Sequence, residues 1–150
     1  MAFGRYYEDF EVGAVYQHWP GRTVNAYDNT WFALLSMNQN PLYIDEHYAS
    51  QASTGRPVID TLVFSLTVGI SVADTSGRAI ANLGFESVVF EQPLLTGDSL
   101  YAESEVLEKR GSSSKPDRGV VSIETRGFNQ RRERVIVLRR SMLAPKRTAR

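Results

Sequence analysis

The residues most able to carry out chemistry gather in one polar stretch, "SMNQNPLYIDEHYA", which occupies positions 36–49 between two apolar segments. An amide such as that of Asn38 can hydrogen-bond a water molecule or a carbonyl group, although it cannot take up a proton near neutral pH. The phenol of Tyr43 can donate a proton, but its ordinary pKa of about 10 makes it a weak base without help. The stretch therefore predicts a site that orients a polar ligand and moves protons only with assistance.

The same stretch also has a purely structural interpretation. Asn38 and Asn40 flank Pro41, and Asx side chains commonly accept hydrogen bonds from the backbone of such turns. Asp45 precedes the segment "EHYASQ" and is a candidate helix cap. His47 lies inside that segment, on a face that we expect to point to solvent. At the level of the sequence both interpretations stay open.

Composition limits which kinds of site the chain can hold. With 150 residues, 42% of them hydrophobic, and a formal net charge of zero, we expect one domain over 1–150 and no nucleic-acid partner. The chain has no cysteine and only two histidines, His18 and His47. These counts exclude thiol nucleophiles and thiolate metal sites and argue against a multi-histidine metal centre. No cofactor is expected, and His18 belongs to no motif.

The sequence predicts neither a signal peptide nor a membrane-spanning helix. The N-terminus carries acids where a signal peptide needs an apolar core, and the apolar run 58–73 is broken by Asp60, Ser65 and Thr67. We therefore expect a cytoplasmic protein with no membrane partner, ending in a solvated basic tail over 144–150.

The first half of the sequence predicts helices. Asn25 or Asp28 can cap the first of them, and Pro41 should end it because proline cannot donate the next backbone hydrogen bond. Its helically spaced positions are Trp31, Leu34, Leu35 and Asn38. A short helix over 46–51 should follow, and a longer apolar helix should begin near Pro57. This last helix has a continuous apolar stripe, which predicts that other structure wraps the helix. The stripe comprises Ile59, Leu62, Val63, Leu66, Ile70 and Ala73.

The second half predicts strands. Segments 79–90, 99–110, 119–129 and 134–144 are rich in Val, Ile, Leu, Phe and Tyr and are separated by turn-forming residues. In the second segment, Ala102, Ser104 and Val106 alternate with Glu103 and Glu105, which predicts one buried face and one wet face. A buried helix followed by an antiparallel sheet favours the α+β class, and specifically the hotdog fold, in which a curved sheet wraps a long helix.

Several segments of the sequence together resemble a known family. The segments "FALLSMNQNPLYIDEHYA" and "GRPVIDTLVFSL" are similar to the signature of the MaoC-like, or (R)-specific enoyl-CoA hydratase, hotdog proteins. The segment from "SVADTSGRAI" to "IETRGFNQ" resembles in particular the mesaconyl-CoA hydratase branch. The resemblance covers the chain from about Tyr7 to Arg140, and it lies in the order and spacing of short motifs rather than in any one of them.

The resemblance identifies positions for the chemistry, and this chain departs from the family pattern at the two most important ones. In the family, an aspartate holds and deprotonates the water, and a histidine assists it or protonates the substrate. The matching residues here are Asn38 and Tyr43, with Met37 in place of a glycine. Asn40 and Asp45 keep the pattern, which implies that the loop keeps its shape while its proton-transfer groups change.

Asp60 is the candidate that replaces the missing base. By resemblance it stands at the opening of the buried helix, close to the acyl group, where burial could raise the pKa of a carboxylate. The backbone amide of Thr61 would form the oxyanion hole. The competing interpretation is that Asp60 only caps or begins the helix. Similarly, Tyr43 could close the pocket with its ring without transferring a proton.

The remaining expectations concern ligands and partners. Arg56 precedes the buried helix and could meet the phosphates of coenzyme A or of a carrier-protein arm. An open sheet edge predicts a homodimer with a continuous sheet. The resemblance implies a hydro-lyase that acts on a short branched or dicarboxylic acyl thioester, like mesaconyl-CoA hydratase. The alternatives are an isomerising, dehydrating or cyclising biosynthetic enzyme that acts on a CoA- or carrier-bound acyl or polyketide-like substrate, and a non-catalytic acyl-binding module.

Overall fold

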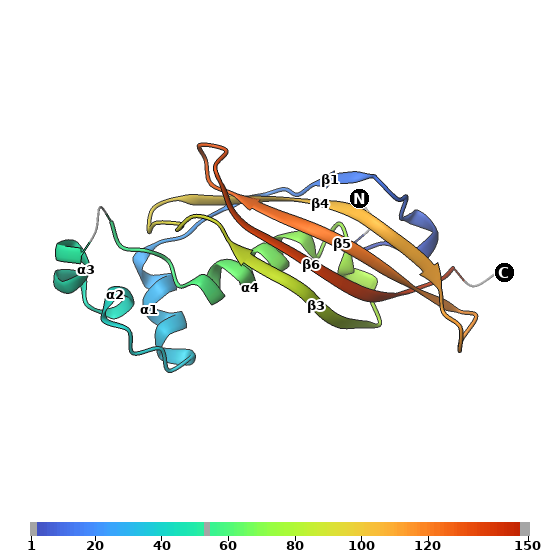
Figure 1. Cartoon of the computed structure of the whole chain (residues 1–150), viewed down its shortest axis with the longest axis horizontal. Helices are drawn as coiled ribbons and strands as arrows, with labels where there is room; N and C mark the ends of the chain where they lie inside the picture. The colour runs from blue at the N-terminus through green and yellow to red at the C-terminus, as the bar shows by residue number, and fades with distance from the viewer. Residues whose placement is uncertain (1–2, 53–54, 148–150) are drawn as a thin grey trace.

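The computed structural model describes residues 3–52 and 55–147, in which an antiparallel sheet lies over a central helix (Figure 1). The strand order is β1-β4-β5-β6-β3, and β2 pairs with β4 outside this path. The strands are β1 (Val15–Gln17), β2 (Arg22–Thr23), β3 (Ala81–Phe90), β4 (Ser99–Gly111), β5 (Arg118–Phe128) and β6 (Arg134–Pro145). The helices are η1 (Tyr7–Asp9), α1 (Ala26–Leu35), α2 (Pro41–Ile44), α3 (Glu46–Ala52), α4 (Asp60–Ser71) and η2 (Ser76–Arg78).

The central helix α4 lies against the inner face of the sheet, so the predicted hotdog arrangement is confirmed (Figure 1). The helix begins at Asp60 with Ile59 as its N-cap. The prediction that it begins near Pro57 is wrong, because Pro57 forms a β-bridge with Leu95 instead. The buried residues within α4 are Leu62, Val63, Thr67 and Ser71, so its inner face is more polar than the predicted stripe.

The four long strands match the predicted segments, and the predicted alternation in β4 is confirmed by the burial of Ala102, Ser104 and Val106. Two features differ from the prediction. The short strands β1 and β2 lie in the half expected to be helical, and β3 pairs with β6 rather than with the next strand in sequence. The connection from β3 to β4 therefore crosses the end of the sheet instead of forming a hairpin.

Helix α1 is capped at its start as predicted and ends for a different reason. Asn25 accepts hydrogen bonds from the first-turn amides in a capping box with Asp28. At the other end, Met37 adopts a left-handed conformation with φ of 56°. The amide of Asn38 then donates to the carbonyl of Ala33 at 2.9 Å, which is the bond that completes a Schellman motif. Pro41 begins α2 rather than stopping α1, so that part of the prediction is wrong.

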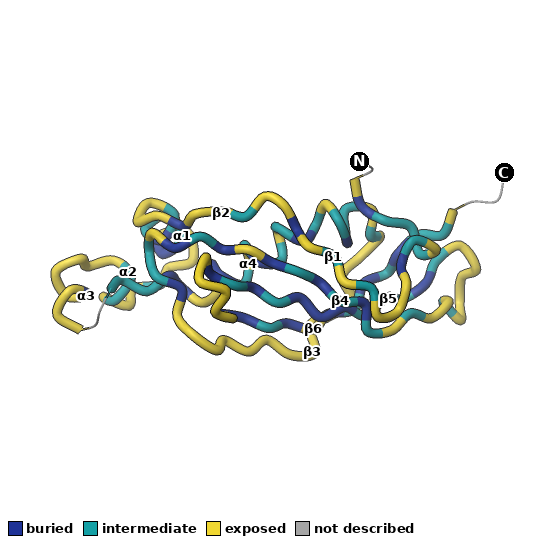
Figure 2. The backbone as a smooth tube through the Cα atoms, turned by 90° about the horizontal axis from the view of Figure 1, so that it is seen from above, coloured by how far each residue is buried: buried dark blue, intermediate teal, exposed yellow. Residues whose placement is uncertain are grey.

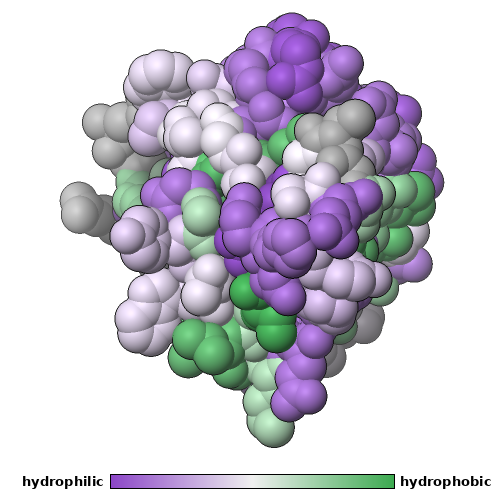
Figure 3. Space-filling model, turned by 90° about the vertical axis from the view of Figure 1, so that its left-hand side faces the viewer, coloured by the Kyte–Doolittle hydropathy of each residue, from purple (hydrophilic) through white to green (hydrophobic). Residues whose placement is uncertain are grey.

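The predicted apolar positions of α1 point away from the sheet. Trp31, Leu34 and Leu35 are exposed by 64%, 67% and 78%, whereas the buried positions are Asn29 and Ala33. Figure 3 views this helical end of the molecule and shows hydrophobic surface between hydrophilic areas. Helices α1, α2 and α3 thus form a lobe with an open apolar side.

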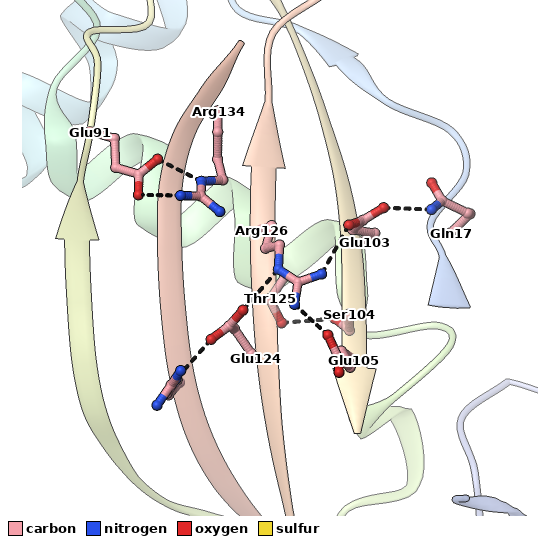
Figure 4. A network of polar contacts seen from close by, with 10 residues as sticks. Gln17, Glu91, Glu103, Ser104, Glu105, Glu124, Thr125, Arg126 and Arg134 are labelled. Atoms are coloured by element: carbon pink, nitrogen blue, oxygen red, sulfur yellow. Dashed lines mark hydrogen bonds and ion pairs between the residues drawn. The ribbon is translucent and has the colours of Figure 1, made fainter. Parts of the chain in front are cut away.

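The outer face of the sheet carries a network of ion pairs around Arg126. Its guanidinium contacts Glu103 and Glu105 on β4 and Glu124 on its own strand (Figure 4). Glu124 also pairs with Arg139 on β6, with a distance of 2.8 Å. Ion pairs therefore connect three of the long strands on the face opposite α4. They should make the sheet that supports the helix more rigid.

The C-terminal segment is docked where the sequence predicts a solvated tail. Ala144 is buried, and the Lys146 amide donates to the Asp117 carbonyl at 2.7 Å. Lys146 and Arg147 also lie over the rings of Tyr7 and Tyr6. The prediction is wrong for residues 144–146, whereas Arg147 is exposed, and the rest of the predicted tail, 148–150, lies outside the described residues.

Strand β3 is the exposed edge of the sheet, and each of its ten residues is exposed (Figure 2). Its side chains include Leu83, Phe85, Val88, Val89 and Phe90. An apolar edge of this kind offers unpaired backbone groups to another strand. None of the helices in the described part of the chain is long and apolar enough to cross a membrane.

Candidate active site

Tyr43 lies within electrostatic range of Asp60, at the start of α4. Asp60 is the first residue of that helix. The residue as a whole is exposed in the single chain, but the surrounding protein partly desolvates its carboxyl, and this burial raises the pKa of Asp60. Tyr43, in α2, is half-buried against the main hydrophobic core. Burial raises the pKa of Tyr43, and the nearby charge of Asp60 raises it further. The pair therefore combines a carboxylate with increased proton affinity and a phenol that keeps its proton.

The N-terminus of α4 also supplies free backbone donors. The first helical amides to find acceptors are those of Leu62 and Val63, which both donate to Ile59 at 2.9 and 3.0 Å. Within the described residues, the amides of Asp60 and Thr61 have no acceptor. Thr61 is exposed. In a helix of 12 residues these amides lie at the positive end of the macrodipole, where they can stabilise a developing negative charge.

Asn38 and Asn40 both take part in the turn, as the structural interpretation predicts. Asn38 Oδ1 accepts from the Asn40 amide at 3.1 Å, and Asn40 Oδ1 accepts from the Leu42 amide at 3.0 Å. The Nδ2 group of Asn38 has no acceptor among the described residues. Asn38 also lines a cavity of about 190 Å³ together with Ala33, Leu34, Met37, Gln39 and Ile44. Neither Tyr43 nor Asp60 lines this cavity, so Asn38 stands apart from that pair.

Arg56 is held inside the lobe by groups of its own chain, whereas the sequence predicts that it contacts a phosphate. Its side chain is only 8% exposed, and its guanidinium donates to the Tyr43 carbonyl, to Thr30 Oγ1 at 3.3 Å and to Glu46 at 3.1 Å. These contacts connect α1, α2 and α3. A guanidinium used in this way is poorly placed to meet a phosphate and well placed to hold the backbone of Tyr43.

The structural roles predicted for two neighbouring residues are confirmed. Asp45 Oδ1 accepts from the Tyr48 amide at 3.0 Å and caps α3. His47 is exposed, and its ring contacts Gln51 on the same helix at 3.0 Å. Neither side chain points to a role in proton transfer.

Asn29 is a site residue that the sequence reasoning missed. It is fully buried in α1, and its amide bonds to the backbone on both sides of Val58, just before α4. The available signal was an asparagine inside a helix, where this residue type is unfavourable without a specific partner.

A second polar cluster lies under the C-terminal end of α4. His18 is buried, with Nδ1 2.9 Å from Asp74 Oδ2 and Nε2 2.8 Å from Ser104 Oγ. Although carboxylate, imidazole and hydroxyl are aligned as in a nucleophilic triad, Ser104 is completely buried and also bonds to Thr125. A hydroxyl without access to substrate cannot act as a nucleophile, so this cluster is structural.

Arg140 is buried beside this cluster without a carboxylate in ion-pair range among the described residues. Its guanidinium donates to the hydroxyls of Ser71, Thr75 and Ser76 and to the side-chain oxygen Oδ1 of Asn82, at 2.9 to 3.3 Å. Burial lowers the pKa of Arg140 to about 10. The group remains charged at neutral pH and depends on neutral oxygens for its solvation.

Protonation of His18 is expected to destabilise the protein. Burial lowers the pKa of His18 from 6.5, and the charge of Arg140 lowers it further, while Asp74 and Glu103 partly oppose this shift. Because the folded-state pKa is depressed, full stability is present above about pH 6.5 and is lost as the pH falls. The slope should be at most about 1.4 kcal/mol per pH unit. Urea unfolding between about pH 7.5 and 5.5 measures it, and His18→Gln should flatten it; an equal slope in the variant contradicts this assignment.

Comparisons with known proteins agree with the fold. They define a hotdog protein of the MaoC-like class. A MaoC domain dehydratase of Chloroflexus aurantiacus superposes with a TM-score of 0.90 at 30% identity, covering 98% of this chain and 42% of that one. The (R)-hydratase of Aeromonas caviae superposes with a TM-score of 0.74 at 27% identity, covering 92% and 99% of the two chains.

Within this class, the model of the mesaconyl-CoA hydratase family matches residues 2–150, and the chain belongs to that family. The mesaconyl-CoA hydratase of Cereibacter sphaeroides is 32% identical over 145 residues, which cover 96% of this chain and 42% of that protein. The β-methylmalyl-CoA dehydratase of Chloroflexus aurantiacus is 32% identical over 145 residues, with 96% and 41% covered. The chain thus spans less than half the length of these relatives.

Proposed function

We propose that this protein is a hydro-lyase that adds water to, or removes water from, a short branched or dicarboxylic acyl-CoA of the mesaconyl-CoA type. The observation that carries the proposal is the pair Tyr43 and Asp60 beside the free amides at the start of α4. Family membership supports a thioester substrate. The structure supports a base and an oxyanion site at the start of α4, with a proton donor within electrostatic range of that base.

In the hydration direction, the Asp60 carboxylate takes a proton from water as the water oxygen bonds to the β-carbon. The electron pair of the double bond moves onto the thioester oxygen, where the Thr61 amide stabilises it. The Tyr43 hydroxyl then protonates the α-carbon, and the proton on Asp60 returns to the Tyr43 phenolate. The Nδ2 group of Asn38, in the separate cavity, is left to hold a part of the substrate distant from the reacting carbons, and Arg56 and Asn40 keep the loop in shape.

The proposal is tested by following the loss of absorbance of the conjugated thioester when purified protein is mixed with mesaconyl-CoA or crotonyl-CoA. Formation of the hydroxyacyl-CoA, identified by mass spectrometry, is the expected result. Tight binding of these thioesters without turnover would instead favour an acyl-binding module. Conversion to an isomer without gain of water would favour a changed reaction.

A second copy of the chain should complete the site. Strand β3 is an exposed apolar edge, and its Phe85 packs edge-to-face on Phe64 of α4 with ring centroids 4.9 Å apart. Pairing of two β3 edges would extend the sheet and bring the partner alongside the open side of α4, which carries Thr61 and Ser65. This arrangement would also remove solvent from Asp60.

Val89→Glu in β3 is expected to dissociate such a dimer, because a carboxylate at the paired edge would lose its hydration on association, at a cost of several kcal/mol. Sedimentation equilibrium should show self-association weakened by roughly 100-fold or more, and turnover should fall at protein concentrations where the variant is monomeric. Val15→Glu, at the opposite edge on β1, is the matched control, since Val15 is 48% and Val89 51% exposed. Equal effects of the two substitutions would contradict pairing through β3.

A further inference from the structure

The side chain of Asn29 connects α1 to the segment that leads into α4. Asn29 is 0% exposed, its Oδ1 accepts from the Ile59 amide at 2.9 Å, and its Nδ2 donates to the Pro57 carbonyl at 3.1 Å. Both ends of one amide are therefore satisfied by backbone groups two residues apart. Ile59 is the N-cap of α4, so one of these bonds fixes the residue directly before Asp60.

The other side of the same segment is held by the loop before β4. The Val58 amide donates to the Leu94 carbonyl at 2.7 Å, and Pro57 forms a β-bridge with Leu95. The segment thus lies between Leu94 and Asn29 as a strand lies between two neighbours. Without Asn29, the Ile59 amide and the Pro57 carbonyl would lose their protein partners in a buried setting, and this side of the segment would be free to shift.

From this geometry we infer that Asn29 is a positioning residue for the active site. It fixes the first turn of α4, with the Asp60 carboxylate and the Thr61 amide, relative to the lobe that carries Tyr43. The next residue, Thr30, meets the guanidinium of Arg56, which donates to the Tyr43 carbonyl. One turn of α1 therefore holds both partners of the proposed proton-transfer pair, and this role rests on the function proposed above.

The expected effect is larger on turnover than on binding. A misplacement of about 1 Å at the reacting groups can cost roughly 100-fold in rate, even when the altered residue does not touch the substrate. Asn29→Leu should therefore lower kcat by roughly 10- to 100-fold with a much smaller change in KM. Ser104→Ala, which also removes buried hydrogen bonds but far from the site, should leave kcat unchanged.

Asn29→Asp gives the sharper test, because its protonation state decides whether the contact can form. An ionised carboxylate can accept from the Ile59 amide but repels the Pro57 carbonyl, whereas a protonated carboxyl supplies one acceptor and one donor, as the amide does. The charged or titratable groups on the adjoining elements are Tyr27, Asp28, Tyr43, Arg56, Asp60, Glu91 and Asp98. Dividing by the wild-type rate at each pH removes their own titration.

The ratio of Asn29→Asp to wild-type kcat should rise as the pH is lowered, over a range where circular dichroism shows both proteins folded. Asn29→Leu should show no such recovery. A ratio that stays constant with pH, or a loss of kcat in Ser104→Ala equal to that in Asn29→Leu, would overturn the positioning role.

A measurement that needs no substrate separates this inference from the proposed function. Amide hydrogen exchange at Ile59, Leu62 and Val63, whose amides donate to Asn29 or to the Ile59 carbonyl, should speed up by at least about 10-fold in Asn29→Leu, while exchange in β5 stays at the wild-type rate. If the wild-type protein hydrates no thioester, the proposed function fails, and the exchange result still decides whether Asn29 holds the start of α4. Unchanged exchange at these three amides would show that it does not.

Discussion

Asp60→Asn should lower kcat for thioester hydration by roughly 10²- to 10⁴-fold, which is the usual contribution of a positioned acid or base. The amide keeps the shape of the side chain but cannot accept the proton of the attacking water. Asp45→Asn is the matched control, because that carboxylate lies in the adjoining lobe and only caps α3. Steady-state hydration assays on the two variants give the comparison, and equal rates for Asp60→Asn and wild type would refute the assignment of the base.

The pH dependence of the wild-type rate provides an independent check. Burial raises the pKa of Asp60, so kcat/KM should fall with decreasing pH at a higher pH than an ordinary aspartate would give. The raised pKa also means that the ionised carboxylate costs folding stability at neutral pH, since the folded state binds the proton more tightly than the unfolded state. Asp60→Asn should therefore lose activity without a drop in melting temperature.

Tyr43→Phe should slow turnover less, because the phenol acts after the carboxylate.

Restoring the family pair is expected to produce the largest gain. The double substitution Asn38→Asp with Tyr43→His should raise the hydration rate of mesaconyl-CoA or crotonyl-CoA, by up to roughly 10²- to 10⁴-fold if both groups reach the substrate. The structure favours tolerance of the first change, because Asp can accept the Asn40 amide as Asn38 does at 3.1 Å. Each single substitution is the control for the double variant.

The outcome of this experiment separates the competing functions. A gain in the double variant that exceeds the product of the two single effects would show that the pocket still accepts an enoyl thioester. No gain, together with intact binding of the thioester, would favour an enzyme whose reaction has changed or a protein that only binds acyl groups. The position of Asn38 in a cavity that Asp60 does not line is the structural reason to test this explicitly.

The sequence predicted the parts of the fold that follow from local patterns. Periodic apolar residues located α4 and the four long strands, because burial against a layer imposes the period on the sequence. The strands β1 and β2 are only three and two residues long, too short to show alternation. The end of α1 was misplaced because it depends on a left-handed Met37, a conformation that favours glycine and that methionine does not signal.

The site was predicted less completely, because its contacts join distant parts of the chain. Asp60 and Tyr43 were identified by resemblance, yet their mutual influence appears only in the folded chain. Asn29 reaches backbone groups 28 and 30 residues away, and no local pattern marks such a pairing. Arg56 was predicted to meet a phosphate because it directly precedes the buried helix, whereas here its guanidinium donates to three groups of the same chain.

The burial of Arg140 restricts how the chain between α4 and β3 can vary in length. Its acceptors come from the end of α4, from the following turn and from Asn82 at the start of β3, all within twelve consecutive positions, 71–82. An insertion or deletion there would pull at least one oxygen away and leave a charge in the interior with too few partners. The β4–β5 loop, by contrast, is exposed at its tip and can lengthen freely. Insertions and deletions among relatives should therefore be concentrated in the β4–β5 hairpin loop and absent from the connection between α4 and β3.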